Sequence, residues 1–307
     1  MLAVAAAALT ACTQDEPEPV PAPARATGSP DTPRSPSSPS SPSKARTGYD
    51  EYVALGDSYT AAPLVPPTDP SPVCLRSEVN YPALVTESMP GTELTDVSCS
   101  GASTRNTVRP QSGIGGSVPP QFDALRRGTD LVTIGLGGND EQLFGSLLGT
   151  CVQAAPQDPN GSPCTDTAAQ GGRDLDAILE RIRENLVEVV AGVRERSPRA
   201  RVLLIGYPQL IPASGTCAEL PLATGDYPFA RQVNQGLADA VGAAARESGA
   251  EFVDVWEPSA GHDICAEEPW INGRVTSSDT ALAYHPLAAG QEAVADLVLQ
   301  TLGGPER

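Results

Sequence analysis

After Thr47, short apolar runs alternate with longer stretches in which apolar residues recur every three or four positions. The short runs are typical of buried strands and fall at residues 52–55, 94–97, 131–135, 201–205 and 252–255. The longer stretches are typical of amphipathic helices and fall at residues 81–88, 118–126, 174–197, 228–248 and 288–302. Strands that alternate with helices predict an α/β fold, a three-layer α/β/α sandwich around a mainly parallel five-stranded sheet.

Three insertions between these elements, at residues 63–80, 145–172 and 208–228, are rich in Pro and Gly. We expect them to be loops, and loops at strand ends shape pockets. Beyond Cys12, an even set of cysteines indicates disulfides in an exported protein: Cys74, Cys99, Cys151, Cys164, Cys217 and Cys265. The sequence leaves several connectivities open, of which sequential pairing closes loop-rich segments. Zinc is disfavoured, because the C-x-x-C spacing of zinc sites is missing.

The N-terminus has the composition of a targeting segment. Residues 1–11 are apolar and Ala-rich, and a Leu-Thr-Ala-Cys motif ending at Cys12 resembles the lipobox of bacterial lipoproteins. An ordinary signal peptide that contains a cysteine is the alternative. Residues 13–47 are mostly Pro, Ser, Ala and Thr without apolar periodicity, which is typical of a disordered tether. We therefore expect a signal peptide with a lipobox at residues 1–12, then the tether, then one catalytic domain at residues 48–307.

The net charge of −18 limits the partners of this protein. Nucleic acid is excluded, because phosphates demand a basic face. Electrostatic docking on anionic lipid is disfavoured for the same reason. We expect an extracellular monomer that contacts the membrane only through a lipid on Cys12.

Two residues suggest nucleophilic catalysis. Ser58 follows Gly56 and Asp57 where the first expected strand breaks into a helix. Its hydroxyl is held at the strand end, and its backbone N–H lacks an intrahelical partner. His285 precedes the C-terminal helix and is a candidate base, since a histidine can take a serine proton and return it to a leaving group. In isolation, the Gly-Asp-Ser tripeptide is equally consistent with a plain turn, and a lone loop histidine is more often structural than catalytic.

Gly101 and Asn139 offer two further hydrogen-bond donors. Gly101 lies just beyond the strand at residues 94–97, where a glycine lets its backbone approach a ligand closely. Asn139 follows two glycines at the end of the strand at residues 131–135 and carries a neutral side-chain donor. With the serine and the histidine, they provide a nucleophile, a base and oxyanion donors. This chemistry needs no metal and no cofactor.

In this order the residues resemble the blocks of the SGNH (GDSL) hydrolase family: Gly56-Asp57-Ser58, Gly101, Gly137-x-Asn139-Asp140 and His285-Pro286. The resemblance covers most of residues 49–302. It implies a flavodoxin-like fold, an acyl-enzyme on Ser58 with His285 as base, and an oxyanion hole from Ser58, Gly101 and Asn139. The loops and cysteines are most similar to secreted actinomycete lipases and esterases with sequential disulfides, which favours the pairs Cys74–Cys99, Cys151–Cys164 and Cys217–Cys265.

One position departs from the family pattern. The family has D-x-x-H-P, but Leu282 stands three residues before His285. Similar actinomycete esterases hold the imidazole with a backbone carbonyl at that place, so we expect the Leu282 carbonyl in this role, with Asp279 as the alternative. A carbonyl fixes the tautomer without pairing with the imidazolium charge, so we expect an ordinary pKa for His285.

The second histidine, His262, lies beside Cys265 and shortly before Trp270. We interpret it as structural or pocket-lining rather than catalytic. Trp270 is a candidate wall for an acyl pocket, because large rings are common in apolar clefts.

These residues predict a secreted or surface-anchored lipase or esterase that cleaves fatty-acyl or simple carboxylic esters. A carbohydrate acetyl esterase and a phospholipase are alternatives that use the same chemistry. A non-catalytic lipoprotein that binds lipid or glycan is a further alternative, although binding alone requires no Ser-His pair. The sequence leaves the acyl chain length and the alcohol of the ester undetermined.

Overall fold

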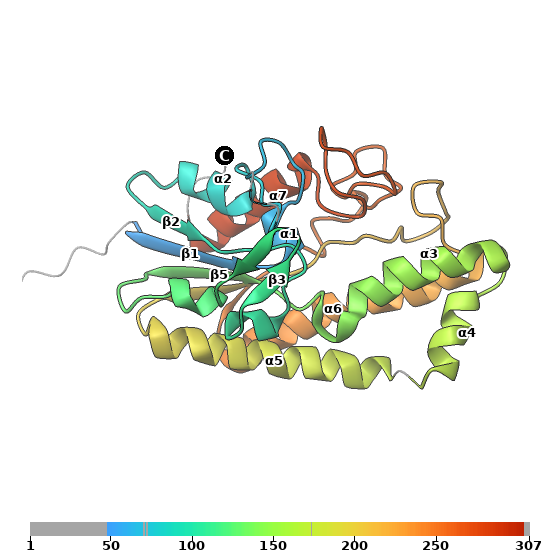
Figure 1. The fold of residues 1–307 in the computed structure, drawn as a ribbon, viewed down its shortest axis with the longest axis horizontal. Coiled ribbons are helices and arrows are strands. Elements are labelled where there is room, and N and C mark those ends of the chain that lie inside the picture. The colour runs from blue at the N-terminus through green and yellow to red at the C-terminus, as the bar shows by residue number, and fades with distance from the viewer. Residues whose placement is uncertain (1–47, 70, 72, 173, 304–307) are drawn as a thin grey trace, which may run out of the picture. The chain divides into compact units, whose positions relative to one another are not determined.

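A parallel sheet of five strands lies at the centre of the computed structural model, which describes residues 48–303 except 70, 72 and 173 (Figure 1). These residues belong to the second of two units into which the chain divides, Arg46–Arg307. The strand order is β2-β1-β5-β6-β7, with bounds Glu93–Asp96, Glu51–Gly56, Leu131–Gly135, Arg201–Ile205 and Glu251–Val253. The expected signal peptide, the lipobox with Cys12, and the tether lie outside the described residues.

β1 has β2 on one side and β5 on the other, and both pairings are parallel. The chain therefore builds the sheet outward in one direction after β1 and in the opposite direction after β2. Such a reversal is a topological switch point, and ligands of open α/β sheets bind there, outside the carboxyl ends of the strands. The segments that follow β1, β2 and β5 meet at this place.

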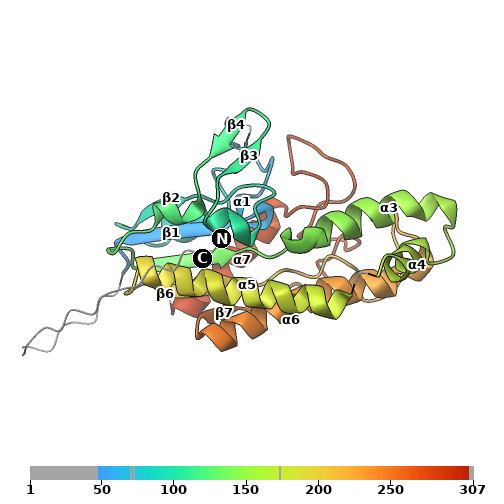
Figure 2. The same cartoon turned by 60° about the horizontal axis from the view of Figure 1, so that its bottom comes forward.

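Helices cover both faces of the sheet (Figures 1 and 2). Because side chains alternate along a strand, Tyr52 and Ala54 of β1 pack in one apolar cluster with α2 (Tyr81–Glu87) and α7 (Ala288–Leu302). Val53 and Leu55 pack in the other cluster, with α5 (Leu175–Arg196) and α6 (Tyr227–Ser248). The predicted three-layer α/β/α sandwich is confirmed.

The helix predicted at residues 118–126 was wrong. The chain instead forms an antiparallel hairpin of β3 (Gln111–Gly113) and β4 (Gly116–Val118), followed by a 3₁₀-helix at Gln121–Ala124. Pro119 and Pro120 separate the two elements. Proline removes a backbone donor and disfavours helical angles in the residue before it, so no helix runs through this pair.

The insertion at residues 145–172 was expected to be a loop and is largely helical. It contains a π-helix at Gly145–Thr150, α3 at Cys151–Ala154 and α4 at Pro163–Gln170. The disulfide Cys151–Cys164 joins α3 to α4. Pro and Gly gave this segment the composition of a loop, although a proline in the first turn of α4 is compatible with a helix.

The other two disulfides are Cys74–Cys99 and Cys217–Cys265. All three pairs are those that the family resemblance implied. Within the described part of the chain, none of the helices is both long and apolar enough to span a bilayer.

Candidate active site

Ser58 begins the short helix α1 (Ser58–Ala61) directly after β1. Asp57 caps this helix, because its Oδ1 accepts the Tyr59 N–H at 2.8 Å, and its own N–H donates to the Gly135 carbonyl of β5 at 2.8 Å. Ser58 is only 7% exposed. Its backbone N–H makes no hydrogen bond to any described residue, so it remains available as a donor beside its own hydroxyl.

A cavity of about 250 Å³ brings Ser58, Asn139 and His285 together. The cavity is also lined by Tyr59, Phe144 and residues 283–284. Gly101 is not among the residues that line this cavity. Its segment is nevertheless aligned with the one that carries Ser58, because the Cys99 N–H donates to the Gly56 carbonyl at 3.0 Å.

The His285 ring is held by a backbone carbonyl, but not by the expected one. Nδ1 lies 2.8 Å from the carbonyl oxygen of Ala283, whereas the Leu282 carbonyl accepts the N–H of His285 itself at 3.2 Å. Neither Leu282 nor Asp279 is the partner of Nδ1, which corrects both expectations. Tyr284 adopts a left-handed conformation (φ 61°), and this turn places the carbonyl two residues back beside the ring.

This contact determines the tautomer of His285. A carbonyl oxygen only accepts, so Nδ1 carries the proton and Nε2 of the neutral ring keeps its lone pair. Removal of the ring from water lowers its pKa below 6.5, and the Ala283 hydrogen bond opposes this shift only in part. The expectation of an ordinary pKa was therefore wrong, because burial disfavours the charged form.

Tyr59 links the serine to the histidine loop. Its hydroxyl donates to the Tyr284 carbonyl at 2.9 Å, and its ring centroid lies 5.7 Å from that of His285. The residue next to Ser58 therefore supports the turn that orients the histidine.

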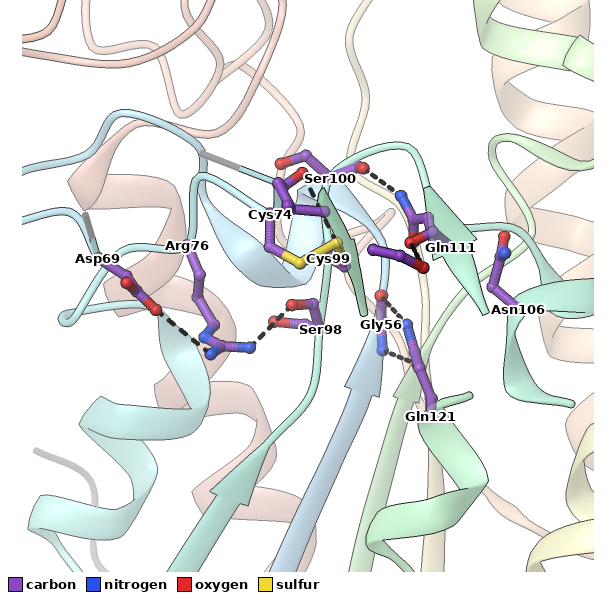
Figure 3. The surroundings of a disulfide bond; sticks show 12 residues. Gly56, Asp69, Cys74, Arg76, Ser98, Cys99, Ser100, Asn106, Gln111 and Gln121 are labelled. Carbon is purple, nitrogen blue, oxygen red and sulfur yellow. Dashed lines mark hydrogen bonds and ion pairs between the residues drawn. A yellow bond between two sulfur atoms is a disulfide. The ribbon is translucent and has the colours of Figure 1, made fainter. Parts of the chain in front are cut away.

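Side-chain donors hold every second carbonyl of the segment that contains Gly101. Arg76 donates to the Ser98 carbonyl at 3.0 Å, and Gln111 Nε2 donates to the Ser100 carbonyl at 2.7 Å (Figure 3). Cys99 between them is tied to Cys74 by the disulfide, as the same view shows. In a trans peptide the C=O and the next N–H point in opposite directions, so a fixed Ser100 carbonyl also fixes the direction of the Gly101 N–H.

Gly101 itself has φ +79°, a conformation that glycine adopts without strain. Its N–H makes no hydrogen bond to any residue that the structure describes. It is therefore a free and oriented donor.

Asn139 is positioned by the same segment. Its Nδ2 donates to the Ala102 carbonyl at 2.9 Å, and since an amide NH₂ carries two hydrogens, one remains for a ligand. Asp140 accepts hydrogen bonds from the N–H and hydroxyl of Thr104 and from Asn185 of α5. The second and third sequence blocks are thereby joined to each other and to a helix.

A buried tyrosine joins the first block to the third. The Tyr207 hydroxyl donates to Asp57 Oδ2 at 2.5 Å and accepts the Gly138 N–H at 2.9 Å. Burial raises the pKa of Asp57 to about 7, although the hydrogen bonds from Tyr207 and Tyr59 oppose the shift.

Gln111 and Tyr207 were missed in the sequence analysis, because neither belongs to a motif or to a segment with an apolar period. Gln121 was missed as well; its side-chain amide makes both a donor and an acceptor bond to the backbone of Gly56 (Figure 3).

His262 and Trp270 form a separate pair. Their rings stack with centroids 4.6 Å apart, and His262 Nδ1 lies 2.7 Å from the Glu268 carbonyl. Neither residue lines the cavity that contains Ser58. The interpretation of Trp270 as a wall of that cavity was wrong, because the ring packs on His262 instead.

The fold and the residues around this cavity are those of a hydrolase that carries a serine at the switch point of a parallel sheet. The chain belongs to the GDSL-like lipase/acylhydrolase family, whose model matches residues 54–293. It is 41% identical to Lipase 2 of Streptomyces coelicolor over 261 residues, which cover 82% of this chain and 86% of the relative.

Solved structures agree. The phospholipase A1 of Streptomyces albidoflavus NA297 is 28% identical with a TM-score of 0.67, over 83% of this chain and 99% of that one. An extracellular lipase of Streptomyces rimosus has the same identity and TM-score, over 82% of this chain and 98% of that one. The protein is therefore a carboxylic ester hydrolase of the lipase/esterase type.

Proposed function

We propose that this protein cleaves fatty-acyl esters through an acyl-enzyme on Ser58, with His285 as the general base. The observation that carries the proposal is the single cavity that Ser58, Asn139 and His285 share. The Ala283 carbonyl leaves Nε2 of His285 as the proton acceptor.

In the first half-reaction, Nε2 of His285 takes the proton of the Ser58 hydroxyl while Oγ forms a bond to the ester carbonyl carbon. Three donors stabilise the resulting oxyanion: the backbone N–H groups of Ser58 and Gly101 and the side-chain amide of Asn139. The imidazolium then gives its proton to the alcohol oxygen as the C–O bond breaks. Water releases the acid in the second half-reaction, again with His285 as base.

A phospholipid is a second candidate substrate. It is favoured by the similarity to the phospholipase A1 of Streptomyces albidoflavus. The net charge of −18 then favours zwitterionic over anionic headgroups.

The test is hydrolysis of p-nitrophenyl esters from acetate to palmitate, beside phosphatidylcholine in mixed micelles, by the oxidised protein. We expect turnover that rises beyond acetate. A maximum at acetate would instead indicate an acetyl esterase, and turnover of phosphatidylcholine alone would indicate a phospholipase.

For localisation, we place the enzyme outside the cell, anchored through Cys12. The three disulfides fit an oxidising compartment. Mass spectrometry of the mature N-terminus tests the anchor: a diacylglyceryl group on Cys12 supports it, and a free N-terminus at another residue contradicts it.

The lowered pKa of His285 makes a pH prediction. Only the neutral ring can accept the serine proton, so protonation abolishes activity, and a lowered pKa moves this loss to more acidic pH. We expect the acid limb of kcat/KM to have its midpoint below pH 6.5. The Asp57 carboxyl, with a pKa of about 7, is the other group whose titration could produce an acid limb in the pH profile of kcat/KM. A limb near pH 7 that disappears in Asp57→Asn would contradict the assignment to His285.

Gln111 is expected to position the Gly101 donor. In Gln111→Glu, a carboxylate oxygen replaces Nε2 opposite the Ser100 carbonyl, and the repulsion turns that peptide away. We expect kcat to fall roughly 10- to 100-fold, as for a small misplacement of a catalytic group, with KM and the acid limb unchanged. The exposed Gln235 of α6 provides the control Gln235→Glu. Equal activity of Gln111→Glu and Gln235→Glu would contradict a positioning role for Gln111.

A further inference from the structure

A second cavity of about 250 Å³ is lined by residues of α3, α4, α5 and α6. The arrangement of these four helices can be followed in Figures 1 and 2. No lining residue that the structure describes carries a charge, and most of the wall is apolar: Leu143, Leu147, Leu175, Ile178, Phe229 and Val233. Protein interiors have few voids larger than a water molecule. A hollow of this size and polarity therefore suits an apolar ligand; an apolar cavity of about 150 Å³ already binds benzene.

The same helical segment lines both this second cavity and the catalytic cavity, so a single helix separates them. Phe144 and Leu148 line the cavity that contains Ser58, whereas Leu143 and Leu147 line the second one. The π-helix Gly145–Thr150 thus presents opposite faces to the two cavities. We call this helix, Gly145–Thr150, the partition, because one helix separates the two cavities.

The partition has features of a segment that can shift. Glu141 and Gln142, just before it, both have positive φ (52° and 57°), a conformation that is strained outside glycine. π-helices are rare and occur often at functional sites. Gly145 and Gly149, which line the catalytic cavity, have open space where a Cβ would lie.

We propose that the second cavity binds the alkyl chain of long-chain acyl esters, which reaches it when the partition shifts. This inference rests on the proposed function, because the carbonyl end of the chain must lie at Ser58. An alkyl chain is the occupant that fits: it needs no hydrogen-bond partner, and it extends from the reacting carbonyl across a partition one helix thick. Each methylene buried there is worth roughly a factor of four in kcat/KM.

Filling the cavity tests the proposal in the full-length, oxidised protein. Ala168 of α4 lines the cavity, and its exposed neighbour Ala169 does not. We expect Ala168→Phe to lower kcat/KM for the palmitate ester at least 10-fold relative to the butyrate ester, since several methylenes lose their site. Ala169→Phe should leave the ratio unchanged. An unchanged ratio in a folded Ala168→Phe protein would overturn the proposal; if that variant does not fold, Val233→Phe replaces it.

Binding of palmitate to the Ser58→Ala variant, measured by titration calorimetry, separates this inference from the proposed function. Saturable binding that Ala168→Phe removes supports the cavity even if no ester is hydrolysed. Ser58-dependent hydrolysis without such binding would leave the catalytic proposal standing and overturn the cavity.

Discussion

Ser58→Ala is expected to lower kcat for ester hydrolysis by on the order of a million-fold, the effect of removing the nucleophile from a serine hydrolase. The structure motivates this size, because Ser58 is the serine that lines the catalytic cavity with Asn139 and His285. Its backbone N–H is unchanged in the variant, so the oxyanion donors remain. The loss therefore reports the hydroxyl alone.

The measurement is single-turnover and steady-state hydrolysis of p-nitrophenyl butyrate. Ser88→Ala, at the end of α2, is the matched control and should retain full activity. An active Ser58→Ala protein would contradict the acyl-enzyme. A protein that binds lipid without hydrolysing it would show no turnover before or after the substitution, so Ser58-dependent turnover excludes the binding alternative.

His285→Gln is expected to lower kcat almost as much, by about 10⁵- to 10⁶-fold, because the serine then has no base. His262→Gln is the matched control, because the two histidines have similar hydrogen-bond partners. Both histidines have Nδ1 beside a backbone carbonyl, Ala283 in one case and Glu268 in the other. Only His285 lines the catalytic cavity.

When residues act as one catalytic unit, the losses in kcat caused by substituting each of them are not additive in free energy. We therefore expect the double variant Ser58→Ala/His285→Gln to be no slower than either single variant. A double variant with the product of both losses would mean that the two residues act independently. Comparable losses in His262→Gln and His285→Gln would overturn the assignment of the base.

The order of strands and helices was predictable, because buried strands and amphipathic helices have different apolar periods. Residues 131–135 and 288–302 were placed with their observed bounds. Expectations failed in segments without a period. At residues 118–126 a helix was expected from the apolar content, but a pair of prolines prevents it. At residues 145–172 a loop was expected from the Gly and Pro content, but helices form there and a disulfide joins them.

The partner of His285 shows the limit of reasoning from spacing. Counting three residues back pointed to Leu282, but the left-handed Tyr284 brings the Ala283 carbonyl to the ring. A backbone dihedral angle at a non-glycine residue leaves no trace in the sequence. The lowered pKa of His285 was missed for a related reason, since burial depends on residues far apart in the chain.

The sequence by itself determined the fold class and the disulfide candidates, and it pointed to Ser58, Gly101, Asn139 and His285 as candidate site residues, because these inferences depend on local period and on motifs with fixed chemistry. Only the tertiary structure decided what holds their segments: Gln111 on the Ser100 carbonyl, and Tyr207 between Asp57 and Gly138. It also decided that the helix Gly145–Thr150 separates two cavities. The physical reason is that hydrogen-bond direction and cavity shape arise from contacts between distant segments. Such contacts exist only once the sheet and its helices have packed.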